Sequence, residues 1–486
     1  MSTQHYDVLI LGAGISGIGM ACHLAQKCPD QRYAILERRR AIGGTWDLFR
    51  YPGIRSDSDV VSFGYRFRPW TGTKILADGA SIRAYVNDTA REFGVADKVH
   101  FGLKVTRADW SGADQRWTVS AVDEALGEPR VFSCRWLVSA TGYYDHDAGF
   151  TPDYPGIETF GGRFVHPQQW PEDLDYAGKR VVVIGSGATA VTLIPAMAEQ
   201  TAHITMLQRS PSYVYSVPMS DKVGELLAKV LPQRWLYPLT RRRNIFLQRS
   251  IYKLSRRFPQ QMKALLLRGV RKQIGDGVDM RHFTPRYMPW DERLCAVPDG
   301  DLFKALRAGQ ASVVTDHIER FTGKGILLKS GRELQADIIV SATGLKLQNL
   351  GGMELFVDGQ PRRMGERMTY KGLMLQDVPN LAYLFGYINI SWTLKVDQAA
   401  DYLCRLLDEM KRRGVGVVTP RAPQGEMQAE SVMAGLQSGY VKRAEAGLPR
   451  QGRALPWRVL HHYEKDSAMY RAPVADAQAL EWVAAA

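Results

Sequence analysis

The sequence predicts an α/β fold in which one βαβ architecture occurs twice, with a helical insertion in the second copy. In the first copy, a buried strand at 8–11 precedes a glycine loop at 12–17. In the second copy, a buried strand at 181–184 precedes a glycine loop at 185–190. The same run, Val-Ser-Ala-Thr-Gly, ends both copies, at 138–142 and 340–344. Two copies of one nucleotide-binding architecture are the simplest explanation of this repetition.

The remaining elements follow the same order in both copies. Helices are predicted at 18–27 and from Val191, and second strands at 33–36 and 203–207. From about Tyr213 to Arg293 the strand signal disappears, leucines recur at helical spacing, and prolines at 232, 238 and 259 predict breaks between helices. We expect a first-domain segment at 1–150, a second-domain segment at 151–212, a basic helical insertion at 213–295, the rest of the second domain at 296–346, and the rest of the first domain with a C-terminal tail at 347–486. The segment at 378–393 is expected to rejoin the first domain.

Composition places the chain among ordinary globular proteins. Its 486 residues are too many for one simple core, and 45% hydrophobic with 23% charged residues is a usual balance. Five cysteines in a chain of this length indicate a reducing compartment rather than a disulfide framework. We find no targeting signal and no apolar run of the roughly 20 residues that span a bilayer, so a cytoplasmic location is expected. No metal site is predicted.

The first glycine loop has the pattern GxGxxG between a strand and a helix. Gly12, Gly14 and Gly17 allow a tight turn, close approach of backbone to a pyrophosphate, and close packing of helix on strand. The following strand ends at Glu37, whose carboxylate accepts hydrogen bonds from a ribose 2′-OH and repels a 2′-phosphate. FAD or NAD fits this loop and NADP does not. The alternative is a glycine-rich turn without a ligand, but the full strand–loop–helix context favours a cofactor.

The second glycine loop has the pattern GxGxxA and a different strand end. Its strand ends with Gln208 and Arg209, and Arg209 lies 24 residues after Gly185, much as Glu37 lies 25 residues after Gly12. An arginine at this position pairs with a 2′-phosphate, which favours NADP. The alternative, a surface arginine in a turn, does not explain the matched spacing.

FAD and NADPH in one chain indicate an oxidoreductase and leave three classes open. Disulfide reductases need a redox pair with the spacing CxxxxC just after the first nucleotide unit. The cysteines are at 22, 28, 134, 295 and 404, so this class is disfavoured. Electron-transfer reductases and monooxygenases remain.

The segment between the two nucleotide units carries a twelve-residue signature. It fits FxGxxxHxxxWP, with Phe160, Gly162, His166, Trp170 and Pro171 at the fixed positions. Here the sequence resembles the class B flavoprotein monooxygenases, and the Trp-Pro ending resembles their Baeyer–Villiger branch. A histidine in a linker is more often structural than catalytic, so we assign His166 to domain coupling rather than to proton transfer.

Four further stretches resemble the ethionamide-activating monooxygenases, which are a Baeyer–Villiger group. They cover 43–57, 282–287, 291–295 and 391–395. The resemblance implies an NADPH- and O2-dependent enzyme that converts a ketone to an ester or lactone through a C4a-peroxyflavin, and that also oxidises sulfur in sulfides and thioamides. The implied partners are molecular oxygen and a small hydrophobic ketone or sulfide. The alternatives are a heteroatom oxygenase with little ketone activity and an NADPH:flavin reductase that inserts no oxygen.

The resemblance assigns the catalytic pair to Arg293 and Asp57. In the family, an arginine lies over the flavin and an aspartate after the Tyr-Pro-Gly turn contacts it. A peroxide anion must stay deprotonated to attack a carbonyl, and a guanidinium stabilises it without giving up a proton. The same cation can stabilise the oxyanion that follows. A departure from the family is Glu292, where relatives have Lys or Gln, because a carboxylate facing the NADP phosphate weakens its binding.

The resemblance also implies two sets of cofactor contacts. Together with the glycines of the first loop, the FAD set is Ser16, Glu37, Thr45, Trp46, Asp47, Leu48, Asp57 and Val105. The NADP set is Arg55, Ser56, Asp57, Gly185, Ser186, Gly187, Ala188, Thr189, Ala190, Gln208 and Arg209. Asp57 belongs to both sets, which places it between the two cofactors.

The net charge of +13 comes from one segment. From Lys222 to Gln273 there are 14 basic residues and one acidic residue, Glu225, whereas the rest of the chain has 49 of each. No nucleic-acid recognition module accompanies this charge, so no nucleic-acid partner is expected. Two readings stay open: helices packed on the protein with solvated arginines, and a basic amphipathic surface on an anionic membrane, which would place the enzyme peripherally at the inner face of the cell membrane.

Overall fold

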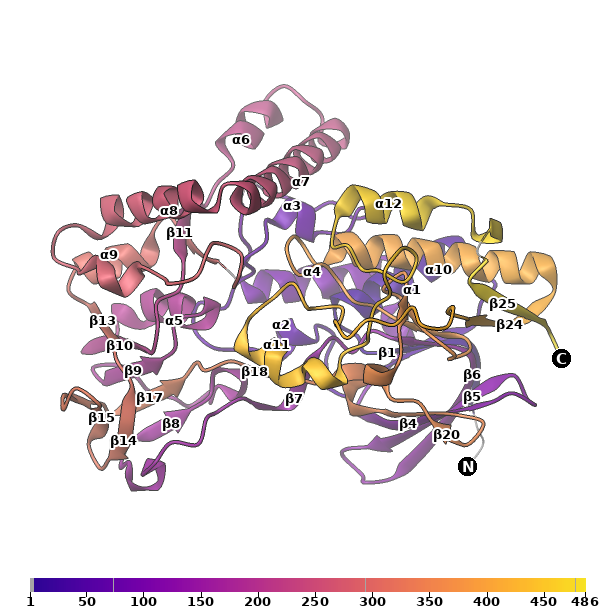
Figure 1. The fold of residues 1–486 in the computed structure, drawn as a ribbon, viewed down its shortest axis with the longest axis horizontal. Helices are drawn as coiled ribbons and strands as arrows, with labels where there is room; N and C mark the ends of the chain where they lie inside the picture. The colour runs from indigo at the N-terminus through magenta and orange to yellow at the C-terminus, as the bar shows by residue number, and fades with distance from the viewer. Residues whose placement is uncertain (1–3, 73, 293, 477) are drawn as a thin grey trace.

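A computed structural model describes residues 4–72, 74–292, 294–476 and 478–486. The first glycine loop lies at the carboxyl ends of the parallel strands of a large mixed sheet, on the right of Figure 1. Here β1 (Gln4–Leu11) pairs in parallel with β2 (Tyr33–Leu36) and with β6 (Pro129–Ser139). Because the carboxyl ends of parallel strands meet at one edge, the loop after β1, the end of β2 and the Ala-Thr-Gly run after β6 converge there.

The rest of this sheet extends outward from these three strands. Its order is β20-β19-β4-β5-β6-β1-β2-β3, with β23 beside β6. The other strands are β3 (Val99–His100), β4 (Leu103–Ser111), β5 (Arg116–Asp123), β19 (Glu354–Val357), β20 (Gln360–Pro361), β21 (Thr369–Tyr370), β22 (Met374–Leu375) and β23 (Leu381–Tyr383).

The second glycine loop lies at the edge of a five-stranded parallel sheet, on the left of Figure 1. Its order is β13-β10-β9-β17-β8, all pairs being parallel. The strands are β8 (Arg163–Val165), β9 (Arg180–Ile184), β10 (His203–Gln208), β13 (Ala311–Thr315) and β17 (Ile338–Ser341). The fold is therefore α/β with one architecture present twice, as the sequence predicts.

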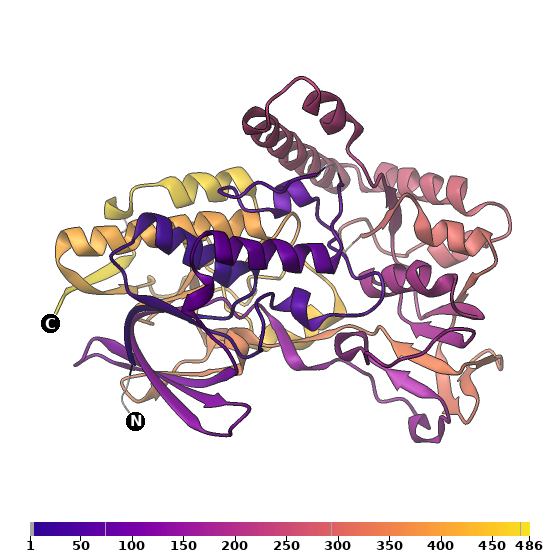
Figure 2. The same cartoon turned by 180° about the vertical axis from the view of Figure 1, so that it is seen from behind.

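Helices cover both sheets. The first sheet is covered by α1 (Ile15–Lys27), with α4 (Gly79–Glu92) beside it in the view from behind (Figure 2). Residues 15–24 of α1 are all buried, which makes it a core helix. After β23, α10 (Thr393–Arg413) packs against α1. In the second sheet, α5 (Ala188–Ala198) follows β9 and packs against α9 (Asp301–Arg307).

The remaining elements are short connections and the C-terminal segment. They are α2 (Thr45–Leu48), α3 (Val60–Phe63), α11 (Gly439–Ala444), α12 (Tyr463–Arg471), β7 (Tyr144–Gly149), β11 (Val214–Val217), β12 (Cys295–Pro298), β14 (Ile318–Thr322), β15 (Gly325–Leu328), β16 (Glu333–Gln335), β18 (Leu345–Leu347), β24 (Val415–Pro420) and β25 (Leu480–Ala484). No helix in the described ranges is long and apolar enough to cross a membrane.

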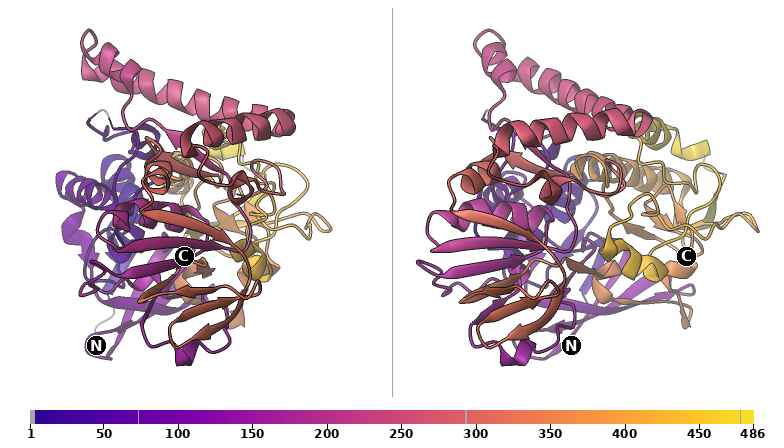
Figure 3. Two further views of the ribbon diagram at one scale, coloured as in Figure 1. Left: turned by 90° about the vertical axis from the view of Figure 1, so that its left-hand side faces the viewer. Right: turned by 60° about the vertical axis from the view of Figure 1, so that its left-hand side comes forward.

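Three helices lie between β11 and β12 along the chain. They are α6 (Lys222–Ala228), α7 (Gln233–Arg257) and α8 (Pro259–Ile274). In Figures 1 and 3, α6 and α7 rise above the body of the molecule. The predicted breaks at Pro232 and Pro259 are confirmed, since these prolines lie where α7 and α8 begin. The break predicted at Pro238 is wrong, because this proline lies inside α7, near its start, where a missing N–H removes a single hydrogen bond.

Both glycine loops are shorter than predicted. The helices begin at Ile15 and Ala188, three residues before the predicted starts. In each case the last three residues of the glycine pattern form the first helical turn. The N-caps are Gly14 and Gly187, and neither end has a side-chain cap. The first N–H groups of both helices are therefore not satisfied by a capping side chain.

Candidate functional site

The glycines of the first loop are fixed by close backbone contacts. Gly12 has φ +98°, and a Cβ there would lie 2.8 Å from the carbonyl oxygen of Ala140. A Cβ on Gly17 would overlap the carbonyl oxygen of Gly12. Gly44, which has φ +55°, would place a Cβ 2.9 Å from the Cα of Gly14. Any side chain at these positions pushes the helix away from the strand or closes the approach to the helix N-terminus.

Glu37 is buried beside this loop. Its Oε2 accepts a hydrogen bond from the N–H of Ala13 over 2.6 Å, and its Oε1 accepts one from the N–H of Arg39 over 2.7 Å. Burial raises the pKa of Glu37, against the lowering effect of these two backbone donors. Each carboxylate oxygen keeps a free lone pair, so the group can accept further hydrogen bonds from a ribose.

The predicted residues of α2 lie next to the loop, because Gly44 packs on Gly14. Asp47 is buried and bonded to arginines from three positions, Arg39, Arg50 and Arg83. Burial opposes its charge, but the hydrogen bond from Arg39 and the nearby guanidinium groups lower the pKa of Asp47 overall.

The other predicted FAD contacts flank this centre. Thr45, Trp46 and Leu48 lie on α2, and Trp46 packs edge-on against Phe63 with 5.9 Å between ring centroids. Val105 is half-buried on β4, whose first residue, Leu103, donates its N–H to the carbonyl of Glu37 over 3.0 Å.

Ser16 is covered by a tryptophan from far along the chain. Trp392 Nε1 donates a hydrogen bond to Ser16 Oγ over 2.9 Å. The Trp392 ring stacks on Tyr143, 5.2 Å away at 24°, and packs against Phe385 at 5.2 Å. A Cβ on Gly386 would overlap the Trp392 ring. The segment around Trp392 therefore closes one side of the first loop.

The second loop repeats this backbone but is less covered. Gly185 has φ +134°, and a Cβ there would overlap the carbonyl oxygen of Ala342, which corresponds to Ala140 in the first unit. Nothing lies within 4 Å of a Cβ built on Gly187, and Gly187 and Ala188 are exposed. Ser186 Oγ donates to the carbonyl of Ser210 over 3.1 Å and lies 2.8 Å from Ser212 Oγ.

The strand end of the second unit has one buried and one exposed polar residue. The Gln208 amide is buried and donates to the carbonyl of His282 over 2.7 Å and to Thr315 Oγ1 over 2.8 Å. Arg209 is exposed, and among the described residues no ion pair or hydrogen bond is recorded for its guanidinium. Burial raises the pKa of Glu292, opposed by the charges of Lys442 and Arg209, so these two cations lie near this carboxylate.

The turn at 51–53, which belongs to the first βαβ copy, packs on α5 and on the second glycine loop. A Cβ on Gly53 would lie 2.7 Å from Ala196 Cβ and 2.8 Å from the carbonyl oxygen of Thr192, both on α5. Tyr51 is buried in the core of the second unit. Burial raises its pKa to about 12, although a hydrogen bond with Thr189 of the second loop lowers it. The turn at 51–53 thus joins the two units.

The predicted residues after this turn lie between the units. Arg55 Nη1 is 3.4 Å from Asp301 Oδ2, and burial lowers the pKa of Arg55. Ser56 is buried and accepts the N–H of Ser58 over 3.1 Å. Asp57 is exposed and lies near Tyr215, where its charge adds to burial in raising the pKa of that phenol. Arg293, the predicted catalytic arginine, lies outside the described residues.

His166 of the linker signature has both ring nitrogens engaged. Nε2 donates to the carbonyl of Gly344 over 3.1 Å, and Nδ1 accepts the N–H of Gln168 over 3.2 Å. Burial lowers the pKa of His166, against the raising effect of backbone hydrogen bonds. A Cβ on Gly149 would overlap the His166 ring. Both ring nitrogens of His166 thus contact backbone groups, and its assignment to domain coupling stays a prediction.

The other signature residues pack around this histidine. A Cβ on Gly162 would overlap the carbonyl oxygen of Asp337, and Phe160 packs edge-on against Phe321 at 6.3 Å. Trp170 packs on the core of the second unit, and the carbonyl of Pro171 accepts the N–H of Leu174 over 3.3 Å.

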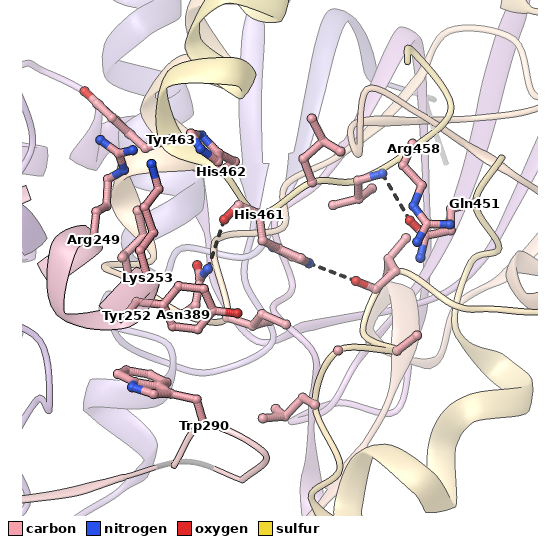
Figure 4. A pocket seen from close by; sticks show the side chains of 18 of the residues that line it. Arg249, Tyr252, Lys253, Trp290, Asn389, Gln451, Arg458, His461, His462 and Tyr463 are labelled. Atoms are coloured by element: carbon pink, nitrogen blue, oxygen red, sulfur yellow. Dashed lines mark hydrogen bonds between the residues drawn. The ribbon is translucent and has the colours of Figure 1, made fainter. Parts of the chain in front are cut away.

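A cavity of about 410 Å³ lies between α7 and the C-terminal segment (Figure 4). Its lining includes Tyr252 of α7, Trp290, Ile388 to Ile390, and residues between 430 and 463. Trp290 and His461 have φ of +73° and +49°, in the left-handed region that residues other than glycine adopt uncommonly. Trp290 Nε1, Asn389 Oδ1 and His461 Nδ1 are buried without a hydrogen-bond partner among the described residues. Ile390 is two residues before Trp392, so the cavity wall continues into the cover of the first loop.

Comparison with known proteins decides the family. A model of the flavin-binding monooxygenase-like family matches residues 76–349, more than half of the chain, and a model of the NAD(P)-binding Rossmann-like domain matches residues 10–73. The chain belongs to the flavin-binding monooxygenase-like family.

Relatives of this monooxygenase match it from end to end. MymA of Mycobacterium tuberculosis is 60% identical over 487 residues, covering 99% of this chain and 98% of its own. EthA of Mycolicibacterium smegmatis, an FAD-containing monooxygenase, is 49% identical over 482 residues, covering 99% and 97%. The resemblance to flavoprotein monooxygenases is thus confirmed.

Solved structures share the fold. A steroid monooxygenase bound to NADP has a TM-score of 0.80 at 22% identity and covers 99% of this chain and 100% of its own. The OTEMO complex with FAD and NADP has a TM-score of 0.77 at 21% identity, with the same coverage. The predicted fold class is confirmed, and the nucleotides in these complexes are the two that the sequence predicts.

The sequence did not single out several residues of this monooxygenase that the structure places at the two loops. They are Tyr51, Tyr143, Tyr215, Phe385 and Lys442. Tyr143 directly follows the first Ala-Thr-Gly run, and this position in the sequence could have identified it as a residue near the first loop. Lys442 is 150 residues from Glu292, and no local pattern connects them.

Proposed function

We propose that this chain is an FAD-containing, NADPH- and O2-dependent Baeyer–Villiger monooxygenase. It inserts one oxygen atom beside a ketone carbonyl to give an ester or lactone, and it also oxidises sulfur in sulfides and thioamides. Its substrates are small hydrophobic ketones or sulfides. We assign FAD to the parts at 1–150 and 347–486, and NADP to the parts at 151–212 and 296–346, with the basic helices at 213–295 between them.

The residues of the first loop fit FAD. The N-terminus of α1 has no side-chain cap, and glycines at 12, 14 and 44 leave space for a pyrophosphate at its N–H groups. Buried Glu37 offers acceptor lone pairs at the end of β2. When bound, the flavin accepts the hydride of NADPH and is the place where oxygen is activated.

The residues of the second loop fit NADP. The N-terminus of α5 is exposed and also lacks a side-chain cap. Arg209 lies exposed at the strand end, where its planar guanidinium suits a 2′-phosphate. Lys442 adds a second cation near Glu292, which offsets the unfavourable carboxylate at that position.

The observation that carries the proposal is the contact of the 51–53 turn with α5. This contact supports the proposal because the segment with Arg55, Ser56 and Asp57 directly follows the turn. A hydride transfer needs the reacting atoms of the two cofactors within roughly 3–3.5 Å of each other, so both loops must open onto one shared site beside this segment. In the proposed site, the carboxylate of Asp57 orients the guanidinium of Arg293, and Arg293 stabilises negative charge on the reacting oxygen without donating a proton.

Product analysis tests this proposal. Purified enzyme with NADPH is given a panel of linear, cyclic and aryl ketones and thioethers, and esters, lactones and sulfoxides are quantified. We expect esters or lactones from ketones, and the Arg293→Ala variant should lose ketone turnover while NADPH still reduces the flavin.

Two outcomes would replace the proposal. If Arg293→Ala retains sulfoxidation and the wild type makes no ester, the chain is a heteroatom oxygenase. If every substrate gives hydrogen peroxide in proportion to the NADPH oxidised, the chain is a flavin reductase that inserts no oxygen.

A further inference from the structure

The face of α7 that packs on the protein is polar. Tyr237 Oη donates to the carbonyl oxygens of Val61 and Tyr65, at 3.2 and 3.0 Å. Arg241 is buried and also donates to the Val61 carbonyl, over 2.5 Å. Asn244 and Gln248 both donate to the carboxylate of Asp59. The helix is therefore held on the body largely by hydrogen bonds.

The opposite face of α7 is apolar and exposed. Trp235 and Phe246 are each 63% exposed, and they share one side of the helix with Leu239 and Leu254, while the exposed Ile251 lies at its edge. A surface helix of a globular protein normally has the reverse arrangement, with its apolar stripe toward the core. Eleven of the seventeen large exposed hydrophobic side chains in the described ranges belong to α6, α7, α8 and their connections, so these helices carry most of the exposed apolar surface, here called the apolar patch. The eleven are Val223, Leu226, Val230, Trp235, Leu239, Phe246, Leu247, Ile251, Leu254, Phe258 and Leu265.

The apolar patch is surrounded by cations that the protein itself does not neutralise. Some basic residues of these helices have partners: Arg243 pairs with Asp221, Arg249 with Glu464 and Arg256 with Asp291. Nine others are exposed and have no recorded ion pair in the part of the chain that the structure describes. They are Lys222, Lys229, Arg234, Arg242, Lys253, Arg257, Arg268, Arg271 and Lys272.

We propose that helices α6, α7 and α8 form a docking surface for an anionic lipid membrane. Exposed aromatic and aliphatic side chains bury into the boundary between headgroups and acyl chains, and the surrounding cations attract anionic headgroups. In Figures 1 and 3, α6 and α7 project beyond the rest of the molecule, so a flat surface can reach them. A nucleic acid and a purely solvated surface both fit the charge, but neither fits the eleven exposed apolar side chains.

Docking also places the cavity beside the lipid. Arg249, Tyr252 and Lys253 of α7 line the cavity, while Ile251 and Leu254 of the same turns belong to the apolar face. Apolar substrates dissolved in the bilayer thus reach the cavity along one helix. This consequence rests on the proposed function, whereas the docking itself does not.

Vesicle flotation tests the docking without any turnover. The flavin-loaded protein is mixed with phosphatidylcholine vesicles that contain or lack phosphatidylglycerol, at low and high salt. We expect binding to the anionic vesicles at low salt and weaker binding at high salt. The double variant Phe246→Ser, Ile251→Ser should bind about a hundredfold more weakly, because two apolar side chains no longer leave water. Arg242→Gln should weaken binding about fivefold.

A matched control removes two other exposed apolar side chains, one aromatic and one aliphatic. Phe101→Ser with Leu126→Ser, outside these helices, should leave vesicle binding unchanged. Flavin absorbance and circular dichroism confirm that each variant is folded. The proposal is overturned if the wild type does not float with anionic vesicles at low salt, or if the control variant loses as much binding as the α7 variant. It is also overturned if sedimentation velocity shows a dimer that only the α7 variant dissolves while no vesicle binding occurs, since the face is then a subunit interface.

Discussion

The two glycine loops have the same backbone and differ in what covers them. In the first, Gly14 lies against Gly44, and Ser16 is bonded to Trp392 from the other end of the chain. In the second, Gly187 has nothing within 4 Å of its Cβ position, and Ala188 is exposed. A covered loop suits a cofactor that stays bound through many turnovers. An open loop suits a cofactor that binds and dissociates in every turnover. The comparison thus supports the order FAD then NADPH independently of Glu37 and Arg209.

The largest effect is expected at the last position of each glycine loop, which is Gly17 in the first and Ala190 in the second. Gly17→Ala forces a methyl group into the carbonyl of Gly12, so FAD affinity should fall about a hundredfold. The matched change Ala190→Gly in the second loop should leave flavin content unchanged and cost α5 about 1 kcal/mol of stability. The ratio of flavin to protein absorbance measures the first effect, and thermal unfolding measures the second. Equal flavin loss in both variants would contradict the assignment of FAD to the first loop.

The next effect separates NADPH from NADH. Arg209→Gln should raise the KM for NADPH by about ten- to a hundredfold, because it removes a charge-assisted hydrogen bond to the 2′-phosphate. The KM for NADH and the flavin content should not change. Steady-state NADPH and NADH oxidation measure this directly. If both KM values rise together, Arg209 does not recognise the phosphate.

A smaller effect of opposite sign is expected at Glu292. Glu292→Gln should lower the KM for NADPH about fivefold, since a carboxylate no longer faces the phosphate. Burial raises the pKa of Glu292, so the wild-type carboxyl loses its charge at a higher pH than an exposed one. The KM values of wild type and variant should therefore converge as the pH falls. A constant ratio across the acidic range would show that Glu292 does not act through its charge.

The smallest effect concerns the cover of the first loop. Trp392→Phe keeps the ring against Tyr143 and removes the donor to Ser16, so flavin should dissociate about threefold faster. Ser16→Ala should have a similar effect, and the double variant should add little, because both changes remove the same hydrogen bond. Fluorescence of released flavin follows each rate. Additive effects of the two changes would mean that this hydrogen bond does not hold the cover.

Local patterns in the sequence predict the two βαβ units well. The glycine positions and strand ends are set within short stretches, so spacing alone identifies Gly12, Gly185 and Glu37. The helix starts are missed by three residues because the last three residues of each glycine pattern already form the first helical turn. Contacts that join distant segments have no local signal. Trp392 on Ser16 and Gly53 on α5 depend on how the two units pack, which a single sequence does not show.

The basic segment at 213–295 is likewise only partly predictable from the sequence. Its helices and excess charge can be read from the sequence. The orientation of α7 cannot, because an amphipathic pattern does not say which face packs inward. The contacts of Tyr237 and Arg241 with the 61–65 segment, together with those of Asn244 and Gln248 with Asp59, show that the polar face is the packed one.

The central claim is that this chain inserts an oxygen atom from O2 into its substrate, and isotope labelling tests it most directly. The purified enzyme is supplied with NADPH, a ketone and ¹⁸O2. The mass of the product is determined by mass spectrometry, and hydrogen peroxide is measured in parallel. We predict an ester or lactone that carries one ¹⁸O atom, with peroxide accounting for a minor share of the NADPH oxidised. Product without label, or peroxide equal to the NADPH consumed with every ketone and sulfide offered, would contradict the account.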